Sequence, residues 1–504
     1  MDFFALLAQG ADTLFTFTNL LLLSVGVCLG IFAGSLPGLS SSNTCAIMLP
    51  LTLGMSMEGA LIFMVGIYCG AQYGGAIPAI LLRTPGTTGA GATTIEGYPM
   101  SLQGKADVAL GVSLLSSSLA GIIASVVCLA IIKSAANIAL SFGPAEVFLL
   151  ALTGILLIAS LLGDSVRKGL LSGFIGLLLS TMSADPLLGK PRLNFGFLEL
   201  YDEFPMIPAL VGLFAIPALI DLVGKKRIAE GDIQKIGTIA QTLKGFKETI
   251  ARPFNLIRST FIGLLVGILP GAGIETASFL AYGQAKIWSK DKKTFGKGNI
   301  DGLIAAESSN NAVTAGALVP TFLLGIPGSA TMAVMLASLT LHGVTPGPQV
   351  LQRFPSTVYA LLLATLVASI IFIIFGFYYN RMVSQVTRMN LAYLLPATFV
   401  ICVIGAYAVR YFTFDVYLLI IFGVLGVIMH RQKYPYLPLI LGLVMGPIAE
   451  DNYSRAIALS NGSFKIFFAS DVAKIMWAVI LVVLIVPRVS GLLRKIRAKS
   501  QSRS

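Results

Sequence analysis

The chain has 504 residues, of which 56% are hydrophobic and 12% are charged, with a net charge of +12. Soluble domains carry about 25% charged residues, so this composition excludes a soluble protein and indicates an integral membrane protein. The basic excess lies in short polar segments and in the C-terminal stretch RKIRAKSQSRS. Lysine and arginine placed in this way orient membrane spans, and we predict no nucleic-acid partner.

Apolar runs of membrane-crossing length recur along the chain. The clearest are residues 14–33, 107–132, 144–163, 355–379 and 472–487. Each is close to the roughly 20 residues that a helical span needs, and the first is predicted to be retained because no basic segment precedes it. Further spans are predicted at 169–185, 205–223, 391–409, 411–429 and 434–449. The longest polar stretch, 224–252, is too short for a packed domain.

The sequence G-x-L-P-G follows an apolar run in each half of the chain. GSLPG starts at Gly34 and GILPG starts at Gly267, 233 positions later. In a second pair, residues 74–86 read GGAIPAILLRTPG and residues 316–328 read GALVPTFLLGIPG, a shift of 242 positions. Two matched pairs in the same order predict an internal duplication.

Charged residues indicate that the two halves have opposite orientations. GILPG is flanked by basic segments that include Lys247 and Lys286, whereas no lysine or arginine precedes Arg83 around GSLPG. Because basic loops face the cytoplasm, GSLPG is predicted to enter from the outer face and GILPG from the inner face. The N-terminus is then outside and the C-terminus inside.

The predicted fold is an all-α polytopic membrane protein with two inverted-topology repeats and broken, re-entrant helices. Residues 1–223 form the first repeat, 224–252 a cytoplasmic linker and 253–450 the second repeat. Residues 451–504 form an extra C-terminal span and a basic cytoplasmic tail.

The repeated glycine and proline residues predict a binding site. A broken helix leaves carbonyl and N–H groups that lipid cannot satisfy, so it persists only within protein or beside a watery cavity. Helix N-termini attract carboxylates, and unwound carbonyls bind Na⁺. We expect the breaks to converge on a site for a small anion and its coupling cation, with no Na⁺ ligands assigned. The alternative is that these residues serve only kinks and close helix packing.

The candidate substrate- and ion-binding residues are the glycines and prolines of the breaks with their polar neighbours. They are Gly34, Pro37, Gly38, Ser41, Ser42, Asn43, Thr44, Thr84, Pro85, Gly86, Thr87, Gly267, Pro270, Gly271, Gly273, Glu275, Thr276, Asn310, Asn311, Pro327, Gly328 and Ser329. Hydroxyl and amide groups complete an ion shell without a fixed charge. Serine and asparagine at these positions are also favoured helix N-caps, and the two roles are compatible.

Two charged residues near the breaks have open roles. Glu307 opens the polar run ESSNN, predicted to lie in the first turns of its segment, where it neutralises a cation or lies at the cytoplasmic mouth. Arg83 is suited to a substrate carboxylate or to a structural ion pair. Its counterpart 242 positions later is Gly325, so Arg83 is outside the matched pattern.

Motifs of enzymes are not found in the sequence. There is no G-x-x-x-x-G-K-[ST] for an ATPase, and no G-x-S-x-G or H-E-x-x-H. The two histidines, His342 and His430, are too few and too separate for a metal cluster. We predict no catalytic residue, no enzymatic activity and no cofactor other than a coupling ion, Na⁺ or H⁺.

Together, GSLPG, GILPG, IYCGAQYGGAIPAILLRTPG, TTIEGYPMSLQGKADVAL and GALVPTFLLGIPGSATMAVML resemble the large membrane subunit of the tripartite tricarboxylate transporters, over roughly residues 15–450. The resemblance implies a subunit of a bacterial inner-membrane importer with two partners: a periplasmic solute-binding protein and a small four-span membrane subunit. It also implies elevator-like, cation-coupled symport of tri- or dicarboxylates such as citrate. Alternatives are a passive channel or exporter for small organic anions, and a membrane-embedded enzyme acting on a lipid-linked substrate.

Overall fold

The computed structural model describes residues 3–36, 39–161, 166–182, 184, 190–201, 204–224, 239–269, 273–347, 350–386 and 391–481. These residues are almost entirely helical, and the isolated bridge between Ala184 and Pro191 is their one β-type pairing. The chain divides into two compact units. Unit 1 comprises Met1–Asn137 and Ile207–Val427, and unit 2 comprises Ile138–Met206 and Ile428–Ser504.

Most of the helices run wholly or mainly in unit 1. They are α1 (Phe3–Leu14), α2 (Phe17–Gly34), α3 (Ser41–Met48), α4 (Met57–Leu82), α5 (Thr93–Leu102), α6 (Ala106–Leu140), α9 (Met206–Leu222), α10 (Ile239–Ile250), α11 (Pro253–Ile268), α12 (Ile274–Trp288), α13 (Ile300–Leu324), α14 (Ala330–Leu341), α15 (Val350–Arg353), α16 (Pro355–Val386), α17 (Leu391–Arg410) and α18 (Thr413–Arg431). Short 3₁₀ turns are η1 (Leu49–Gly54), η2 (Thr88–Gly91) and η4 (Lys292–Thr294).

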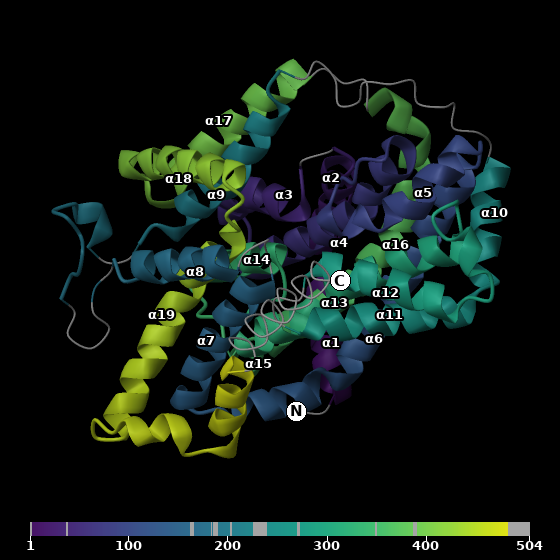
Figure 1. Cartoon of the computed structure of the whole chain (residues 1–504). Coiled ribbons are helices and arrows are strands. Elements are labelled where there is room, and N and C mark those ends of the chain that lie inside the picture. Colours follow the sequence, from purple (N-terminus) through teal and green to yellow (C-terminus); the bar gives the residue numbers. More distant parts are fainter. Residues whose placement is uncertain are drawn as a thin grey trace, which may run out of the picture. The chain divides into compact units, whose positions relative to one another are not determined.

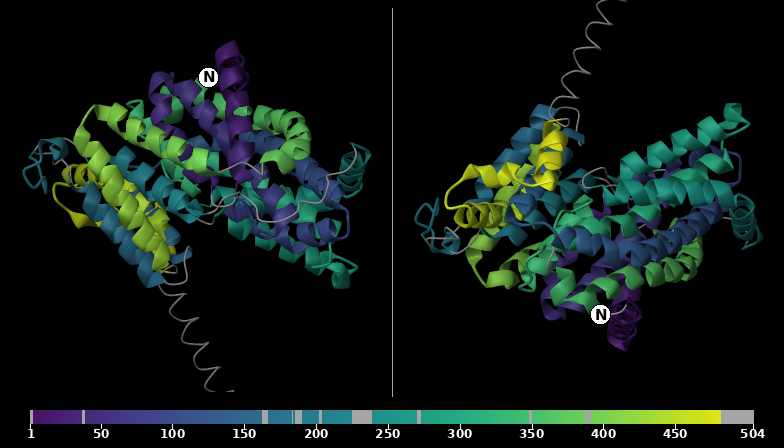
Figure 2. Two further views of the ribbon diagram at one scale, coloured as in Figure 1. Left: turned by 90° about the horizontal axis from the view of Figure 1, so that it is seen from above. Right: turned by 90° about the horizontal axis from the view of Figure 1, so that it is seen from below.

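Unit 2 is built around α7 (Pro144–Leu161), α8 (Val166–Ser180) and α19 (Tyr436–Leu459). These three helices pack against one another and lie together in every view (Figures 1 and 2). Leu149 of α7 and Phe467 belong to a buried cluster of the unit. Phe467 lies in the 3₁₀ turn η5 (Phe464–Phe468), and a further short turn, η3, spans Leu198–Leu200.

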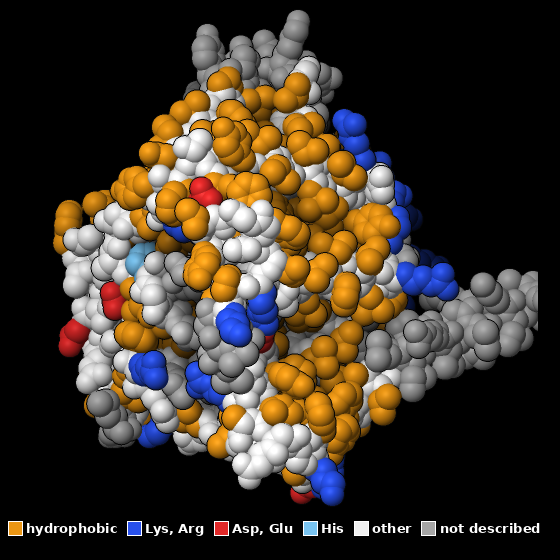
Figure 3. All heavy atoms as spheres, turned by 90° about the vertical axis from the view of Figure 1, so that its left-hand side faces the viewer, with side chains coloured by type: hydrophobic (Ala, Val, Ile, Leu, Met, Phe, Trp, Pro, Cys, Tyr) orange, Lys and Arg blue, Asp and Glu red, His pale blue; other side chains and the backbone are white. Residues whose placement is uncertain are grey.

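Five of the described helices are long and apolar enough to cross a membrane: α2, α4, α6, α16 and α18. The predicted spans at 14–33, 107–132, 355–379 and 411–429 correspond to α2, α6, α16 and α18. Hydrophobic side chains cover much of the face shown in Figure 3, and charged side chains are scattered among them. A surface of this kind matches lipid contact, and the chain is a multi-pass membrane protein.

The remaining predicted spans also fall on helices. Those at 144–163, 169–185, 205–223, 391–409 and 434–449 coincide largely with α7, α8, α9, α17 and α19. Residues 471–481 are helical, and the rest of the predicted span 472–487 lies outside the described residues. Within the polar stretch 224–252, α10 packs on α6, where an added Cβ at Gly245 would overlap the carbonyl oxygen of Val108.

Glycines allow the helices before the breaks to pack at backbone distance. An added Cβ at Gly30 of α2 would overlap the carbonyl oxygen of Ile67, and one at Gly70 of α4 would overlap that of Val27. The pair α11 and α13 is packed in the same way, with Gly263 against the backbone of Ser309. Each pair lies side by side (Figure 1). Small residues at these crossings are the rule for helices that associate in membranes.

Helix α16 supports α4 beside one of the breaks. The ring of Tyr73 in α4 stacks on Phe372 of α16, with ring centroids 5.4 Å apart. Its hydroxyl donates to the side-chain oxygen of Asn380 at 2.8 Å. This buried contact holds the α4 segment that carries the polar side chains described next.

Candidate functional site

Each of the four glycine-proline motifs interrupts a helix. We name the interruptions break A (35–40, between α2 and α3), break B (83–92, between α4 and α5), break C (269–273, between α11 and α12) and break D (325–329, between α13 and α14). All four lie within unit 1. The predicted site residues Pro37, Gly38, Pro270 and Gly271 lie outside the described residues.

The breaks contact one another in pairs through glycine. In break B, Gly86 lies so close to the backbone of Gly34, at the end of α2, that an added Cβ would overlap the Gly34 carbonyl oxygen. In break D, an added Cβ at Gly328 would lie 3.1 Å from the carbonyl oxygen of Gly267 near the end of α11. Carbonyls at two interrupted helices therefore face a neighbouring break instead of lipid.

Two further contacts close these pairs into a ring. Ser41 in the first turn of α3 and Thr331 in the first turn of α14 share a hydrogen bond of 2.8 Å between their hydroxyls. On the other side, an added Cβ at Gly89 of break B would lie 2.5 Å from the side chain of Ile274, the first residue of α12. Break A thus meets B, B meets C, C meets D, and D meets A.

Polar side chains of α4 and α13 reach into this ring. The side-chain nitrogen of Gln72 donates to the hydroxyl of Ser41 at 2.8 Å, and Asn310 donates to the backbone carbonyl of Gln72 at 3.3 Å. The hydroxyls of Tyr68 and Ser329 lie 3.2 Å apart and share a hydrogen bond. All five of these residues are buried. The result is two buried polar groups in the middle of apolar helices, Gln72 with Ser41 and Asn310, and Tyr68 with Ser329; together we call them the polar cluster.

Three oxygen atoms around the ring have no hydrogen-bond partner among the described residues. They are Oε1 of Gln72, Oγ1 of Thr87 and Oδ1 of Asn310, and all three are buried. Leaving a buried polar group unpaired costs about 1–3 kcal/mol. Each is a hard oxygen ligand or a hydrogen-bond acceptor. The set fits an incoming Na⁺, and the Thr87 hydroxyl also fits as a donor to a carboxylate.

Several predicted residues use their side chains for local hydrogen bonds. Their neighbour Ser40 is the N-cap of α3, accepting from the backbone N–H of Asn43 at 3.3 Å. Ser42 and Thr44 bond back to Ser40, through its hydroxyl at 2.8 Å and its carbonyl at 2.9 Å. Ser329 likewise caps α14. Helix capping, one of the two predicted roles, is confirmed at Ser329, which also belongs to the polar cluster.

The other predicted residues lie at the margin of the ring. Thr84, Pro85, Glu275 and Thr276 are exposed, and none of their described hydrogen bonds reaches the cluster. Gly273 has φ +78° and is the N-cap of α12. Asn311 and Pro327 are buried, and the Asn311 amide bonds the Glu307 carbonyl at 3.5 Å.

The polar run 306–311 lies inside its helix and not at the helix start. Helix α13 begins at Ile300, so these residues occupy its second and third turns, at the inner end of the predicted first turns. Glu307 is fully buried, so within unit 1 it does not lie at an open mouth. Capping by Asn299 and the preceding loop moves the helix start upstream, because Asn299 accepts from the N–H of Gly302 at 3.0 Å.

Two residues of the cluster were missed in the sequence analysis, Gln72 and Tyr68. Both lie in the stretch IYCGAQYGGAIP, which precedes the break motif. An amide side chain in the middle of an apolar span is costly to bury without a role. The apolar run 57–82 that forms α4 was not among the predicted spans, and a search of every apolar run for isolated amides would have found Gln72.

A second buried carboxylate, Glu96, holds the loop between α12 and α13 in place. Glu96 of α5 accepts hydrogen bonds from the backbone N–H groups of Gly296, Gly298 and Asn299 at 2.6–2.8 Å. The Tyr282 hydroxyl donates a fourth at 2.8 Å. Helix α5 is thereby fastened to the loop that leads into α13.

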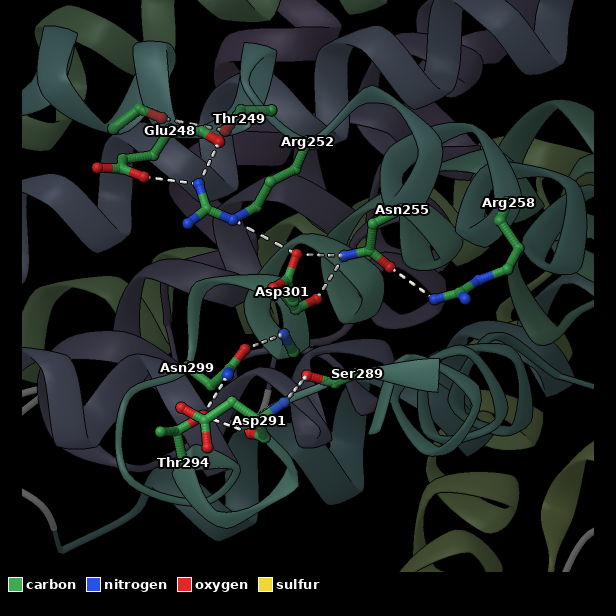
Figure 4. Close-up of polar contacts among 12 residues, drawn as sticks. Glu248, Thr249, Arg252, Asn255, Arg258, Ser289, Asp291, Thr294, Asn299 and Asp301 are labelled. Atoms are coloured by element: carbon green, nitrogen blue, oxygen red, sulfur yellow. Dashed lines mark hydrogen bonds and ion pairs between the residues drawn. The ribbon is translucent and has the colours of Figure 1, made fainter. Parts of the chain in front are cut away.

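Charged residues fix the neighbouring helix ends (Figure 4). Arg252 pairs with Glu248 at 2.6 Å and with Asp301 at 3.4 Å. Asn255 donates to the Asp301 carbonyl at 2.8 Å and accepts from Arg258 at 2.8 Å. This network joins α10, α11 and the start of α13. The carboxylates of Glu248 and Asp301 both pair with Arg252 within it.

Among the described residues, no three His, Cys, Asp or Glu side chains form a group suited to a metal ion. Nδ1 of His342 lies 2.8 Å from the carbonyl of Ser338 one turn earlier in α14. The oxygen atoms around the breaks are therefore the candidate ligands for an alkali cation in this part of the chain.

Comparison with known proteins identifies relatives over nearly the whole chain. The model of the tripartite tricarboxylate transporter TctA family matches residues 20–441. An uncharacterized 52.8 kDa protein in the TAR-I ttuC' 3' region of Agrobacterium vitis is 34% identical over 499 residues, covering 99% of this chain and 98% of that protein. An uncharacterized protein in the TAR-II ttuC' 3' region of the same organism is 32% identical over 237 residues, or 47% of this chain and 96% of that protein. No solved structure matches the chain significantly.

Proposed function

The chain belongs to the tripartite tricarboxylate transporter TctA family, and we propose that it is the large transmembrane subunit of a secondary importer of small carboxylates. The substrates are tri- or dicarboxylates such as citrate, and uptake is symport coupled to a gradient of Na⁺ or H⁺. The partners are a periplasmic solute-binding protein and a small four-span membrane subunit in the bacterial inner membrane.

The observation that carries this proposal is the ring of four breaks with unpartnered oxygen atoms around it. The ring brings together two helix N-termini from opposite halves of the sequence, those of α3 and α14, where the hydroxyls of Ser41 and Thr331 share a hydrogen bond. Helix N-termini attract a carboxylate, and the orphaned oxygens of Gln72 and Asn310 suit a cation. An anion and a cation bound together neutralise each other's charge, which lowers the cost of holding either in the membrane.

The predicted inverted repeat supports alternating access. In the proposed plan, residues 1–223 and 253–450 are inverted copies, 224–252 is the cytoplasmic linker and 451–504 adds a span and a cytoplasmic tail. The N-terminus then faces the periplasm. Breaks A and B belong to one copy and C and D to the other, so a shift of the ring across the membrane would expose it to each side in turn. This is an elevator-type mechanism.

Arg83 is the basic side chain nearest to a break in the first half of the chain. Its side chain is exposed, and the ion pairs of the described residues do not include it. The Tyr98 ring lies 6.0 Å from its guanidinium carbon. We assign Arg83 to the capture of the substrate carboxylate, since a guanidinium binds carboxylates through two parallel hydrogen bonds.

Uptake into proteoliposomes tests the proposed function. Both membrane subunits are reconstituted, the binding protein and radiolabelled citrate, succinate or tartrate are added outside, and Na⁺ and proton gradients are imposed separately. Saturable uptake that needs the binding protein and one of the gradients is expected. Uptake unaffected by removing Na⁺ and collapsing the proton gradient would exclude ion coupling. Flux that does not saturate would favour a channel instead.

A further inference from the structure

Glu307 of α13 has a buried environment made of hydroxyl groups from two other helices. Its Oε2 accepts from Ser113 at 2.9 Å and from Ser117 at 3.0 Å, both on α6. Its Oε1 accepts from Thr93, the first residue of α5. All four residues are fully buried. Three separate segments of unit 1 therefore converge on one carboxylate.

No positively charged side chain balances this carboxylate in the described part of the chain. The ion pairs found there do not include Glu307. The residue 242 positions earlier is Val65, so the carboxylate has no counterpart in the other half. An isolated buried carboxylate is very costly to hold as an anion unless a cation or proton neutralises it. The missing charge indicates a ligand that is not part of the chain.

The ligand atoms favour a metal cation over a proton. A proton needs one acceptor, whereas here the two carboxylate oxygens and three hydroxyl oxygens are gathered at one point, with no nitrogen among them. Hard oxygen donors select hard cations. Rotation of the three O–H bonds away from the carboxylate would turn five oxygen atoms toward one ion. The single negative charge matches a monovalent ion.

The location links this group to the ring of breaks. Glu307 and Asn310 lie one turn apart on α13, and both contact the segment 87–93, which includes the end of break B and the start of α5. Glu307 accepts from Thr93, and the Asn310 side chain lies against Gly89. A cation held between α13, α5 and α6 would therefore fix break B against Asn310. Binding at Glu307 would order the surroundings of the substrate and so couple ion to anion.

We propose that Glu307, with the hydroxyls of Thr93, Ser113 and Ser117, is a Na⁺ site that couples cation binding to substrate binding. This assignment rests on the proposed cation-coupled transport, which it deepens by naming the ion and its ligands. The site is separate from the unpartnered oxygens of Gln72, Thr87 and Asn310, which remain candidate ligands for a cation bound beside the substrate.

Binding of ²²Na⁺ to the purified full-length subunit in nanodiscs tests the site without requiring transport. Wild type is compared with Glu307→Gln, with the double variant Ser113→Ala/Ser117→Ala and with Glu58→Gln, a control carboxylate that accepts from Thr357 at 3.4 Å. We expect the Na⁺ concentration for half-saturation to rise about tenfold or more in Glu307→Gln and several-fold in the double variant, because charged ligands contribute most. Glu58→Gln should match wild type.

Thermal denaturation gives a second reading if Glu307→Gln folds poorly. NaCl, compared with choline chloride, should raise the midpoint of wild type and of Glu58→Gln, and should raise that of the double serine variant by less. Wild-type Na⁺ affinity in both Glu307→Gln and the double variant would overturn the site. So would the absence of Na⁺ binding by wild type together with uptake driven by protons alone.

The two proposals fail in different ways. If the wild-type complex binds Na⁺ through Glu307 but transports no carboxylate, the proposed function is wrong and the cation site stands. If carboxylate uptake is Na⁺-driven and unchanged in Glu307→Gln, the function stands and the assignment of the site is wrong.

Discussion

Arg83 and Gly325 have the same left-handed backbone conformation at the ends of α4 and α13, with φ +60° and +72°. Their backbone N–H groups close the helices on the carbonyls of Pro78 and Pro320, which are 242 positions apart in the sequence, as are Arg83 and Gly325 themselves. A residue other than glycine in this conformation costs about 1–2 kcal/mol. A strained arginine at a break points to a role for its side chain, as proposed above.

The substitution Arg83→Gly separates that role from folding. Glycine adopts the left-handed conformation without strain, at an entropic cost of about 0.5–1 kcal/mol in the unfolded chain. We therefore expect the thermal midpoint to stay equal or rise slightly, while the apparent KM for the carboxylate rises about tenfold. Arg83→Lys, which keeps the charge, should retain part of the affinity. Unchanged uptake kinetics in Arg83→Gly would remove Arg83 from substrate capture.

Asn310→Ala removes one unpartnered oxygen and the hydrogen bond to the Gln72 carbonyl. Loss of a ligand hydrogen bond costs about 1–3 kcal/mol, so the apparent KM for substrate or Na⁺ should rise about tenfold or more, with normal amounts in the membrane. Initial uptake rates at graded concentrations measure both constants. The control is Asn452→Ala in unit 2, whose amide only bonds the Ile448 carbonyl one turn earlier. Equal constants in the two variants would place the ligand elsewhere.

Two glycines of break B provide a test variant and its control. A Cβ at Gly86 would overlap the carbonyl oxygen of Gly34, whereas one at Gly91 would meet the Phe279 ring at an ordinary 3.4 Å. Overpacking costs about 1–3 kcal/mol, so Gly86→Ala should reduce uptake at least tenfold by separating breaks A and B. Gly91→Ala should transport at nearly the wild-type rate. Similar activity of both variants would show that the contact between the breaks is dispensable.

Glu96→Gln tests a structural carboxylate. The amide that replaces the carboxylate has only one oxygen, and its NH₂ group opposes backbone N–H donors that now bond Oε2. We expect stability to fall by about 2–4 kcal/mol, seen as a lower thermal midpoint in detergent, with the substrate KM of the folded fraction nearly unchanged. Glu248→Gln, in a more exposed ion pair, is the control. A raised KM with unchanged stability would instead connect Glu96 to binding.

Many of the helices could be predicted from the sequence because their apolar runs have the length of a span, and the breaks could be predicted because they carry glycine and proline. Helix α4 also has the length of a span but was not predicted as one. The polar residues after the breaks were also predicted, and Ser41, Thr87, Asn310 and Ser329 come together around the ring. Gln72 was missed, since a single polar residue in an apolar run changes the mean hydropathy little. Its partner Ser41 is 31 positions away, and only the crossing of α3 and α4 brings them together.

The exposure of the polar side chains that follow the breaks could not be predicted from the sequence. Glu275 and Thr276 follow break C as closely as Ser41 and Ser42 follow break A, but they are exposed while the serines are buried. The difference arises because α3 is covered by α14 and α4, whereas the first turn of α12 buries Ile274 and Ala277 and leaves Glu275 and Thr276 exposed. Thr276→Val is accordingly expected to change uptake less than Asn43→Ala, measured as apparent affinity for substrate and Na⁺.

The location of a bound carboxylate tests the account most directly. An experimental structure of the complex of both membrane subunits, determined with saturating substrate and Na⁺, should show the carboxylate inside the ring of breaks, within hydrogen-bond distance of Thr87 or the first turn of α3. Density for the substrate outside breaks A to D, with the oxygens of Gln72 and Asn310 still unpaired, would contradict the account.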